Sequence, residues 1–275
     1  MTASGWEWLA VAAVLAVLDW ITVAVRARWL ERWLKPATLG CLVVAAVLGR
    51  PHHAGVHGWL VAALVLGLLG DLALVLPDEP AHRPAGLVPA GASRTAQAGR
   101  PFEAGRIAEP GRAVGIPNPD QPAELARPGT GAHRPAPEQS ERFFLLGLLS
   151  FLIGHICYSM AMLRFGVDPL SVGFGLILML LAVFAFGYRI IAGGHQAGGA
   201  LLSSGITCYI VALGSAVMLG VGTTRLLIAG GILLFAASDL VLAGDRFVRS
   251  RPYSALVVVV LYHCGQALLL IGLLR

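Results

Sequence analysis

The sequence predicts an all-α protein, a polytopic membrane bundle of eight transmembrane helices, and three observations lead to this class. Of the 275 residues, 57% are hydrophobic and only 13% are charged, whereas a soluble domain carries about 25% charged residues. The apolar residues form runs of roughly 20, the length that crosses a bilayer as a helix. These runs lack the alternation typical of strands, so helices are the structure that satisfies their backbone in lipid.

Proline marks several limits of these runs. Pro36 suits the first turn of the second helix, where no backbone hydrogen bond is lost. Pro77 closes the third run, and Pro252 precedes the eighth. The expected spans are residues 6–25, 36–49, 58–76, 142–163, 167–188, 200–219, 224–243 and 253–274.

Residues 77–141 have a different composition. They hold 12 of the 16 prolines, eight acidic residues and seven arginines. Such a segment buries too little apolar surface to offset the entropy lost on ordering. We expect residues 77–141 to be a disordered cytoplasmic insertion, and residues 1–76 and 142–275 to form one membrane domain.

Basic residues gather on one side of the predicted bundle, mainly in the connections 26–35 and 244–252. The positive-inside rule then places loops 1, 3, 5 and 7 in the cytoplasm and both termini outside. Because these residues flank apolar spans, the net charge of +5 does not indicate nucleic-acid binding. Nearly all basic residues are Arg, and Ala and Gly are abundant, which is typical of a high-GC bacterial genome. We therefore expect a bacterial cell (inner) membrane.

Three aspartates interrupt the apolar runs: Asp19, Asp71 and Asp239. A charged residue in the membrane costs about 2.5–3.5 kcal/mol on insertion scales, so it is a candidate functional residue. All three precede the ends of parallel spans, which places them roughly 6–9 Å below the same membrane face. Any one of them could instead reach the interface or pair with an arginine or with Lys35, the single lysine, which lies at that face.

Histidine and tyrosine enter from the same face on two other spans. His155 and Tyr158 share one helix face, and both Tyr262 and His263 share a face with Gln266. With the aspartates they are expected to line a polar funnel that is open on one side and roughly 15–20 Å deep. Alternatively, they form interhelical hydrogen bonds that only hold the bundle together.

Two of the spans contain a similar short sequence. One contains Gly70-Asp71-Leu72-Ala73-Leu74 and the other Ser238-Asp239-Leu240-Val241-Leu242, and the helix after each carries a histidine close to a tyrosine. The two spans are four helices apart and run in the same direction. We expect two four-helix halves that are parallel repeats around a midplane site.

Two carboxyl groups in different surroundings can divide acid and base roles between them, which suits hydrolysis without a metal or cofactor. The chain has no GxSxG, HExxH or Walker sequence, and its histidines, cysteines and acids lack the spacing of a metal site. A proton-coupled transporter and a non-catalytic lipid-binding protein are alternatives. A metal-dependent lipid amidase or esterase is a further one.

Five motifs together resemble the YhhN-like lysoplasmalogenase family. They are Lys35-Pro36, Gly70-Asp71, Gly154-His155-x-x-Tyr158, Ser238-Asp239 and Tyr262-x-x-x-Gln266. The resemblance covers essentially the whole chain except residues 77–141, and it implies an eight-span membrane protein, since the family has that fold. Its human members are lysoplasmalogen hydrolases. The resemblance therefore implies cleavage of the vinyl ether bond of a lysophospholipid, giving a fatty aldehyde and a glycerophospho-head group.

Residue roles follow from that implied reaction, which needs an acid, a group that stabilises an oxocarbenium ion, and a base that orients water. We expect Asp239 or Asp71 to be the acid and the other to stabilise the cation. His155 or Tyr158 would orient water, and Lys35 would bind the substrate phosphate. The other expected substrate-binding residues are Asp19, Tyr158, Tyr262, His263 and Gln266.

Overall fold

The computed structural model describes residues 2–51, 53, 55–75 and 138–275, and its regular structure is entirely helical in these ranges. Six helical segments among the described residues are long and apolar enough to cross a membrane. The chain is therefore a multi-pass helical membrane protein. The fourth helix begins at Glu138, ahead of the expected start of its span. The remainder of the expected insertion, residues 77–137, lies outside the described residues.

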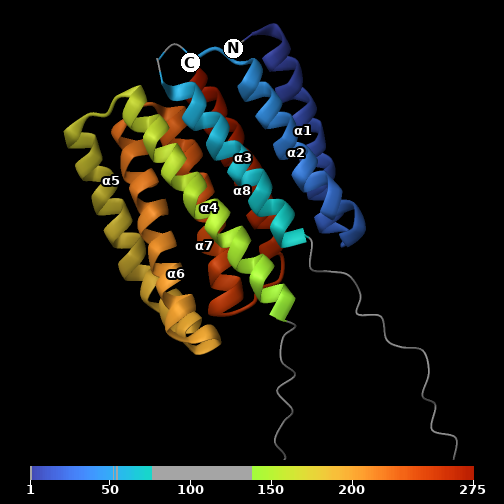
Figure 1. Cartoon of the computed structure of the whole chain (residues 1–275), viewed down its shortest axis with the longest axis vertical. Coiled ribbons are helices and arrows are strands. Elements are labelled where there is room, and N and C mark those ends of the chain that lie inside the picture. Colours follow the sequence, from blue (N-terminus) through green and yellow to red (C-terminus); the bar gives the residue numbers. More distant parts are fainter. Residues whose placement is uncertain (1, 52, 54, 76–137) are drawn as a thin grey trace, which may run out of the picture. The chain divides into compact units, whose positions relative to one another are not determined.

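Eight α-helices and one π-helical turn follow one another along the described chain (Figure 1). They are α1 (Ala3–Ala24), α2 (Arg28–Leu48), α3 (Val56–Val75), α4 (Glu138–Phe165), α5 (Pro169–Ala182), η1 (Val183–Gly187), α6 (Tyr188–Gly222), α7 (Leu226–Phe247) and α8 (Ser254–Leu274). In the described part of the chain, each expected span overlaps one or more of these helices. The expected span limits differ from the observed helix limits most clearly at the start of α2 and between η1 and the break at Gly198 in α6.

The start of α2 corrects the prediction for the first connection. The helix begins at Arg28, so Pro36 lies inside it and Lys35 is two turns beyond its start. We expected these first turns to be a loop, and that prediction was wrong. Trp29 and Trp33 are four residues apart and are 68% and 73% exposed, as is typical of aromatic side chains at a membrane interface. This part of the helix is amphipathic, with charged residues between the apolar ones, so it does not form a continuous apolar run.

The longest apolar segment, Pro169–Gly222, doubles back on itself. The backbone leaves helical geometry at Gly198 and Gly199, and Gly199 has a φ of +67°, a conformation that glycine adopts without a steric cost. At the ends of the segment, the Asp168 N–H donates to the Gly222 carbonyl oxygen at 2.8 Å. The segment is therefore a helical hairpin, in which α5 packs against α6.

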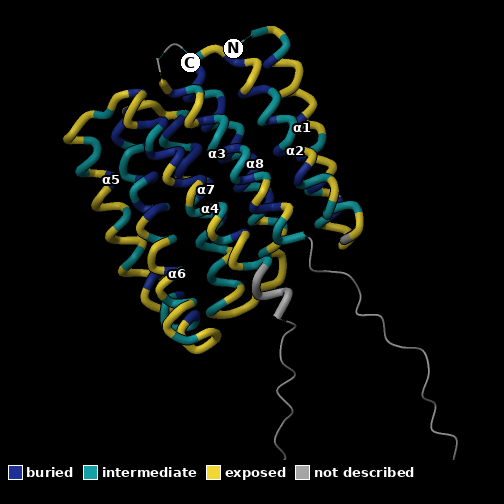
Figure 2. Tube along the Cα trace, in the orientation of Figure 1, coloured by how far each residue is buried: buried dark blue, intermediate teal, exposed yellow. Residues whose placement is uncertain are grey.

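At the centre of the bundle is α8, which packs against α1, α2, α3, α4 and α7. Its buried residues include Tyr262, His263 and Gln266. In contrast, α5 is largely exposed (Figure 2), and Gly175 is its one buried residue. Since apolar side chains on the outside of a membrane protein face lipid, this distribution is expected for a membrane bundle.

Two glycines allow α7 and α8 to approach closely. A Cβ atom at Gly265 would lie 2.9 Å from both the Gly231 carbonyl oxygen and the Phe235 nitrogen, and one at Gly231 would lie 2.8 Å from the Leu269 nitrogen. Small residues at helix contacts are a common means of association in membranes. The close approach also brings the Phe235 and Tyr262 rings to 5.3 Å between their centres.

Replacing Gly265 by alanine is expected to destabilise the protein by about 1–3 kcal/mol, the usual cost of overpacking, because its new methyl group would meet backbone atoms. Thermal denaturation in detergent would measure the effect. Gly230 is a matched control on α7, because a Cβ atom there meets nothing within 4 Å. Equal melting temperatures for Gly265→Ala and Gly230→Ala would contradict this account of the packing.

Candidate active site

Asp71, near the end of α3, is held by a lysine and a tyrosine. The Lys35 ammonium lies 2.9 Å from Asp71 Oδ1, and the Tyr262 hydroxyl donates to Oδ2 at 2.9 Å. The Asp71 side chain is 0% exposed and that of Lys35 is 24% exposed. An unpaired charge in such a place would cost several kcal/mol. These contacts join α2 and α8 to α3.

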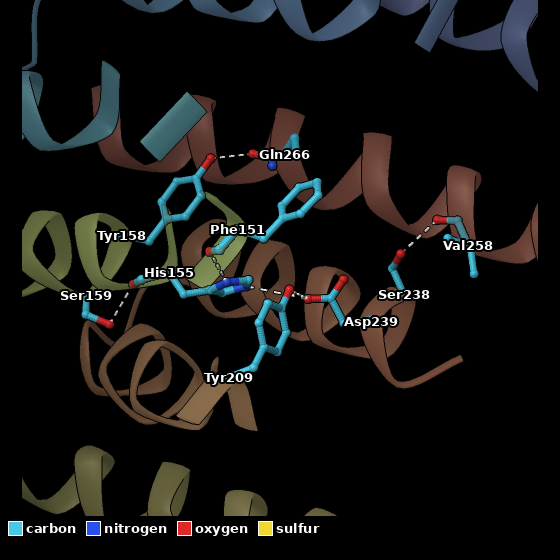
Figure 3. Close-up of polar contacts among 9 residues, drawn as sticks. All are labelled: Phe151, His155, Tyr158, Ser159, Tyr209, Ser238, Asp239, Val258 and Gln266. Atoms are coloured by element: carbon cyan, nitrogen blue, oxygen red, sulfur yellow. Dashed lines mark hydrogen bonds and ion pairs between the residues drawn. The ribbon is translucent and has the colours of Figure 1, made fainter. Parts of the chain in front are cut away.

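Asp239, on α7, is held by different partners. The Tyr209 hydroxyl of α6 donates to Asp239 Oδ2 at 2.6 Å, and His155 Nε2 of α4 lies 3.6 Å from the same oxygen (Figure 3). His155 Nδ1 is 2.7 Å from the Phe151 carbonyl oxygen. That oxygen can only accept a hydrogen bond, so we assign the ring proton to Nδ1. In a neutral ring, Nε2 then directs a lone pair toward Asp239.

The Phe235 ring packs against residues of both aspartate sites. Its centre lies 4.9 Å from that of His155 and 5.3 Å from that of Tyr262. It also contacts Tyr158 edge-on, at 6.3 Å between ring centres. Because Phe235 is itself buried, the polar groups around it lie in a poorly solvated environment. Hydrogen bonds are electrostatically stronger there than in water.

Tyr158 and Gln266 form an interhelical contact. The Tyr158 hydroxyl donates to Gln266 Oε1 and so links α4 to α8 (Figure 3). Both side chains are buried. The contact matches the bundle-holding role that the sequence left open for these residues.

Asp19 and His263 lie on two helices that pack together, α1 and α8. Trp20, next to Asp19, donates its indole N–H to His263 Nδ1 at 3.2 Å. Asp19 is fully buried, and its carboxylate oxygens form no hydrogen bond with another described residue. The same holds for His263 Nε2.

A cavity of about 370 Å³ lies beside Asp239. Most of its lining is apolar and comes from α4, α5, η1, α6 and α7. Its polar lining comes from Lys35, Tyr209, Ser238, Asp239, Arg246 and Tyr262. The volume falls within the range of about 300–1,000 Å³ that is usual for small-molecule sites. An apolar cavity with a few polar groups suits an amphiphilic molecule.

The structure brings only some of the expected site residues together at this cavity. Lys35, Asp239 and Tyr262 line it. Asp71 and His155 each contact one or more of these lining residues. Asp71 and His155 themselves lie outside the lining, as do the other expected residues, Asp19, Tyr158, His263 and Gln266. Their functional roles stay predictions.

Tyr209 and Arg246 also line the cavity, although neither was predicted to be a site residue. Tyr209 carries a hydroxyl group in an apolar span. It could have been identified because a tyrosine hydroxyl inside a membrane bundle needs a hydrogen-bond partner. Arg246 was counted only as one of the charges that orient the protein. As for metals, the described residues offer no group of three or more His, Cys, Asp or Glu that could hold an ion.

The fold and this site define a polytopic membrane protein with a partly buried polar centre beside an apolar cavity. More particularly, the chain belongs to the YhhN family. Residues 135–273 match the model of that family. This range covers α4–α7, all of α8 but its last residue, and the cavity lining except Lys35 and Leu74. The match does not include α1–α3, so the motifs at Lys35 and Asp71 lie outside it.

Several known proteins are similar to this chain. Bovine lysoplasmalogenase TMEM86A is 31% identical over 141 residues, 48% of this chain and 55% of that protein. Mouse lysoplasmalogenase TMEM86B is 31% identical over 137 residues, 48% of this chain and 54% of that protein. The chain spans about half the length of the curated relatives it matches. No solved structure matches it significantly.

Removing one member of the Lys35–Asp71 pair is expected to lower the free energy of unfolding more than removing both. Lys35→Met should cost about 2–4 kcal/mol, somewhat less than the 3–5 kcal/mol typical of breaking a fully buried pair, because Lys35 is partly exposed. The double variant Lys35→Met/Asp71→Leu removes both charges and should recover part of that loss. Thermal denaturation of the single and double variants gives the coupling, and strictly additive losses would contradict it.

Proposed function

We propose that this chain is an integral membrane hydrolase that cleaves the vinyl ether bond of lysoplasmalogens. The products would be a fatty aldehyde and a glycerophospho-head group. The position of Asp239 carries the proposal, because its carboxyl group lines an apolar cavity and contacts both Tyr209 and His155. The lysoplasmalogenase relatives support the proposal over about half of their length.

Asp239 is the general acid in this proposal. The Asp71 carboxylate is engaged in an ion pair with the Lys35 ammonium, which suits it to a structural role. Asp239 contacts a phenol and an imidazole instead, and His155 Nε2 can take a proton from its carboxyl group or return one. Two carboxyl groups with such different partners can divide their roles. Asp71 then holds Lys35 and Tyr262 in place at the cavity wall.

The reaction proceeds in three steps. The Asp239 carboxyl gives its proton to the outer alkene carbon, whose π electrons form the C–H bond, and an oxocarbenium ion results. Water adds to the carbon next to the ether oxygen, and its extra proton returns to the Asp239 carboxylate. The hemiacetal then loses its hydroxyl proton while the ether oxygen gains one, so the C–O bond breaks to give aldehyde and alcohol. One water is consumed, and the acid is regenerated.

We also propose that the bundle crosses the membrane eight times. Among the six apolar segments, the hairpin Pro169–Gly222 supplies two crossings, and α2 supplies one more. Arg246 and Arg249 lie near the end of α7 that faces the same side as Lys35, which supports cytoplasmic loops 1, 3, 5 and 7 and external termini. The membrane would be the bacterial inner membrane.

The contacts of the two aspartates support an internal repeat of two four-helix halves. Asp71 and Asp239 each lie on the third helix of a half. The second helix of the same half contributes a donor, Lys35 to Asp71 and Tyr209 to Asp239. The fourth helix of the other half contributes Tyr262 to Asp71 and His155 to Asp239. This exchange is expected for parallel repeats around a shared site.

Asp239→Asn is expected to lower the turnover number for aldehyde release by at least about 100-fold, the lower end of a general acid's contribution. The assay uses the purified full chain with a lysoplasmalogen, and the matching ester lysolipid should remain intact. Asp245→Asn is the control on α7, because that carboxylate accepts from the Arg251 N–H at 2.7 Å and does not line the cavity. Wild-type turnover in folded Asp239→Asn protein would rule out this role.

Tyr209→Phe removes the hydroxyl that orients the Asp239 carboxyl but keeps the ring that packs on His155. We expect the turnover number to fall by about 10- to 100-fold, since small misplacements of a reacting group cost that much, while the melting temperature changes little. Exposed Tyr253 provides the control variant, Tyr253→Phe. Unchanged turnover in Tyr209→Phe protein would show that the hydroxyl has no part in catalysis.

Assays on the same purified protein distinguish the proposed hydrolase from the other classes of function. A proton-coupled carrier would release no aldehyde and would show solute flux coupled to pH. A lipid-binding protein without catalysis would bind lysolipid saturably and form no product. A metal-dependent amidase or esterase would cleave the ester lysolipid and lose activity with a chelator.

A further inference from the structure

The cavity presents its groups in a definite order along α7. Arg246 follows Asp239 by seven residues, which is two helical turns on the same face and about 10 Å along the axis. Leu233 precedes Asp239 by six residues, about 9 Å in the opposite direction. All three residues line the cavity. Along the helix the lining therefore changes from a guanidinium to a carboxyl group and then to apolar side chains.

The Arg246 guanidinium packs on an aromatic ring of the cavity lining. Its central carbon lies 3.7 Å from the centre of the Phe144 ring, and Phe144 also lines the cavity. Arg246 is an exposed residue near the end of α7. A guanidinium on an aromatic face keeps its N–H donors in its own plane, where they can bind an anion.

The other basic residue in the lining, Lys35, is already neutralised by Asp71. In the described part of the chain, Arg246 makes cation–π contacts and no ion pair with a carboxylate. Arg249 and Arg251 are exposed near the same end of α7, but they do not line the cavity. Arg246 is thus the cation best placed to bind an anion that enters this cavity.

We propose that Arg246 binds the phosphate of the lysophospholipid substrate. This inference rests on the proposed function and names the head-group site, for which the sequence indicated Lys35. Phosphate, vinyl ether and alkyl tail follow one another along a lysoplasmalogen as Arg246, Asp239 and Leu233 follow one another along α7. A guanidinium can bind two phosphate oxygens with parallel hydrogen bonds, which a lysine ammonium cannot do.

Binding of a saturated alkyl-ether lysophosphatidylcholine tests this site without turnover, because that lipid has no vinyl ether bond. The corresponding alkylglycerol lacks the phosphate, and glycerol 3-phosphate lacks the tail. Using the full chain in neutral detergent, we expect Arg246→Gln to raise the Kd of the lysophospholipid about tenfold, as for one lost charge-assisted hydrogen bond. The Kd of the alkylglycerol should not change. Arg246→Lys should keep part of the affinity, and Arg249→Gln should match the wild type.

An unchanged Kd for the lysophospholipid in Arg246→Gln protein would overturn the inference. So would an equal loss for the alkylglycerol, which would indicate a structural role. Competition by glycerol 3-phosphate as strong as that of the lipid would point to a soluble phosphate ester and overturn the assignment to a lysolipid. Arg246-dependent binding in a wild-type protein that releases no aldehyde would support this site while removing the proposed reaction.

Discussion

The burial of Asp71 is the constraint on which the helices around it depend. A charged carboxyl group inside an apolar bundle must meet a cation and hydrogen-bond donors, because leaving it alone costs several kcal/mol. Lys35 from α2 and Tyr262 from α8 supply them. Tyr262 also packs on Phe235 of α7. One carboxylate on α3 is therefore linked to the placement of three other helices, with α8 at their centre.

Asp239 is also partly enclosed by the bundle, but its contacts differ from those of Asp71. It receives a hydrogen bond from Tyr209 and faces His155, and no described lysine or arginine pairs with it. Its contacts therefore hold the carboxyl group in position without a permanent countercharge. This arrangement accords with the role of proton donor proposed for Asp239, and the ion pair of Asp71 accords with the structural role proposed for that carboxylate. The difference between two aspartates in similar sequence contexts lies entirely in residues from other helices.

Those distant contacts also explain how much of the protein could be predicted from its sequence. Continuous apolar runs predict helices reliably because lipid leaves the backbone few other structures. The first turns of α2 were missed because Arg28, Glu31 and Arg32 interrupt the apolar residues there. The possibility of a pair between Lys35 and an aspartate was recognised, since that lysine lies at the right face. The contact of Tyr209 with Asp239 was not recognised, because a single tyrosine hydroxyl in an apolar span produces no periodic pattern.

The apolar part of the cavity lies beside the least buried helix. Its lining includes Leu178 and Met179 of α5 and Val183 and Gly187 of η1, although α5 is largely exposed. The π-helical geometry of η1, often found at functional sites, thus occurs in the cavity wall. An exposed apolar helix of a membrane bundle faces lipid, so one wall of this part of the cavity is formed by a lipid-facing helix. The polar groups approach the end of α7, so the cavity suits a molecule with its tail in the membrane and its head group at the surface.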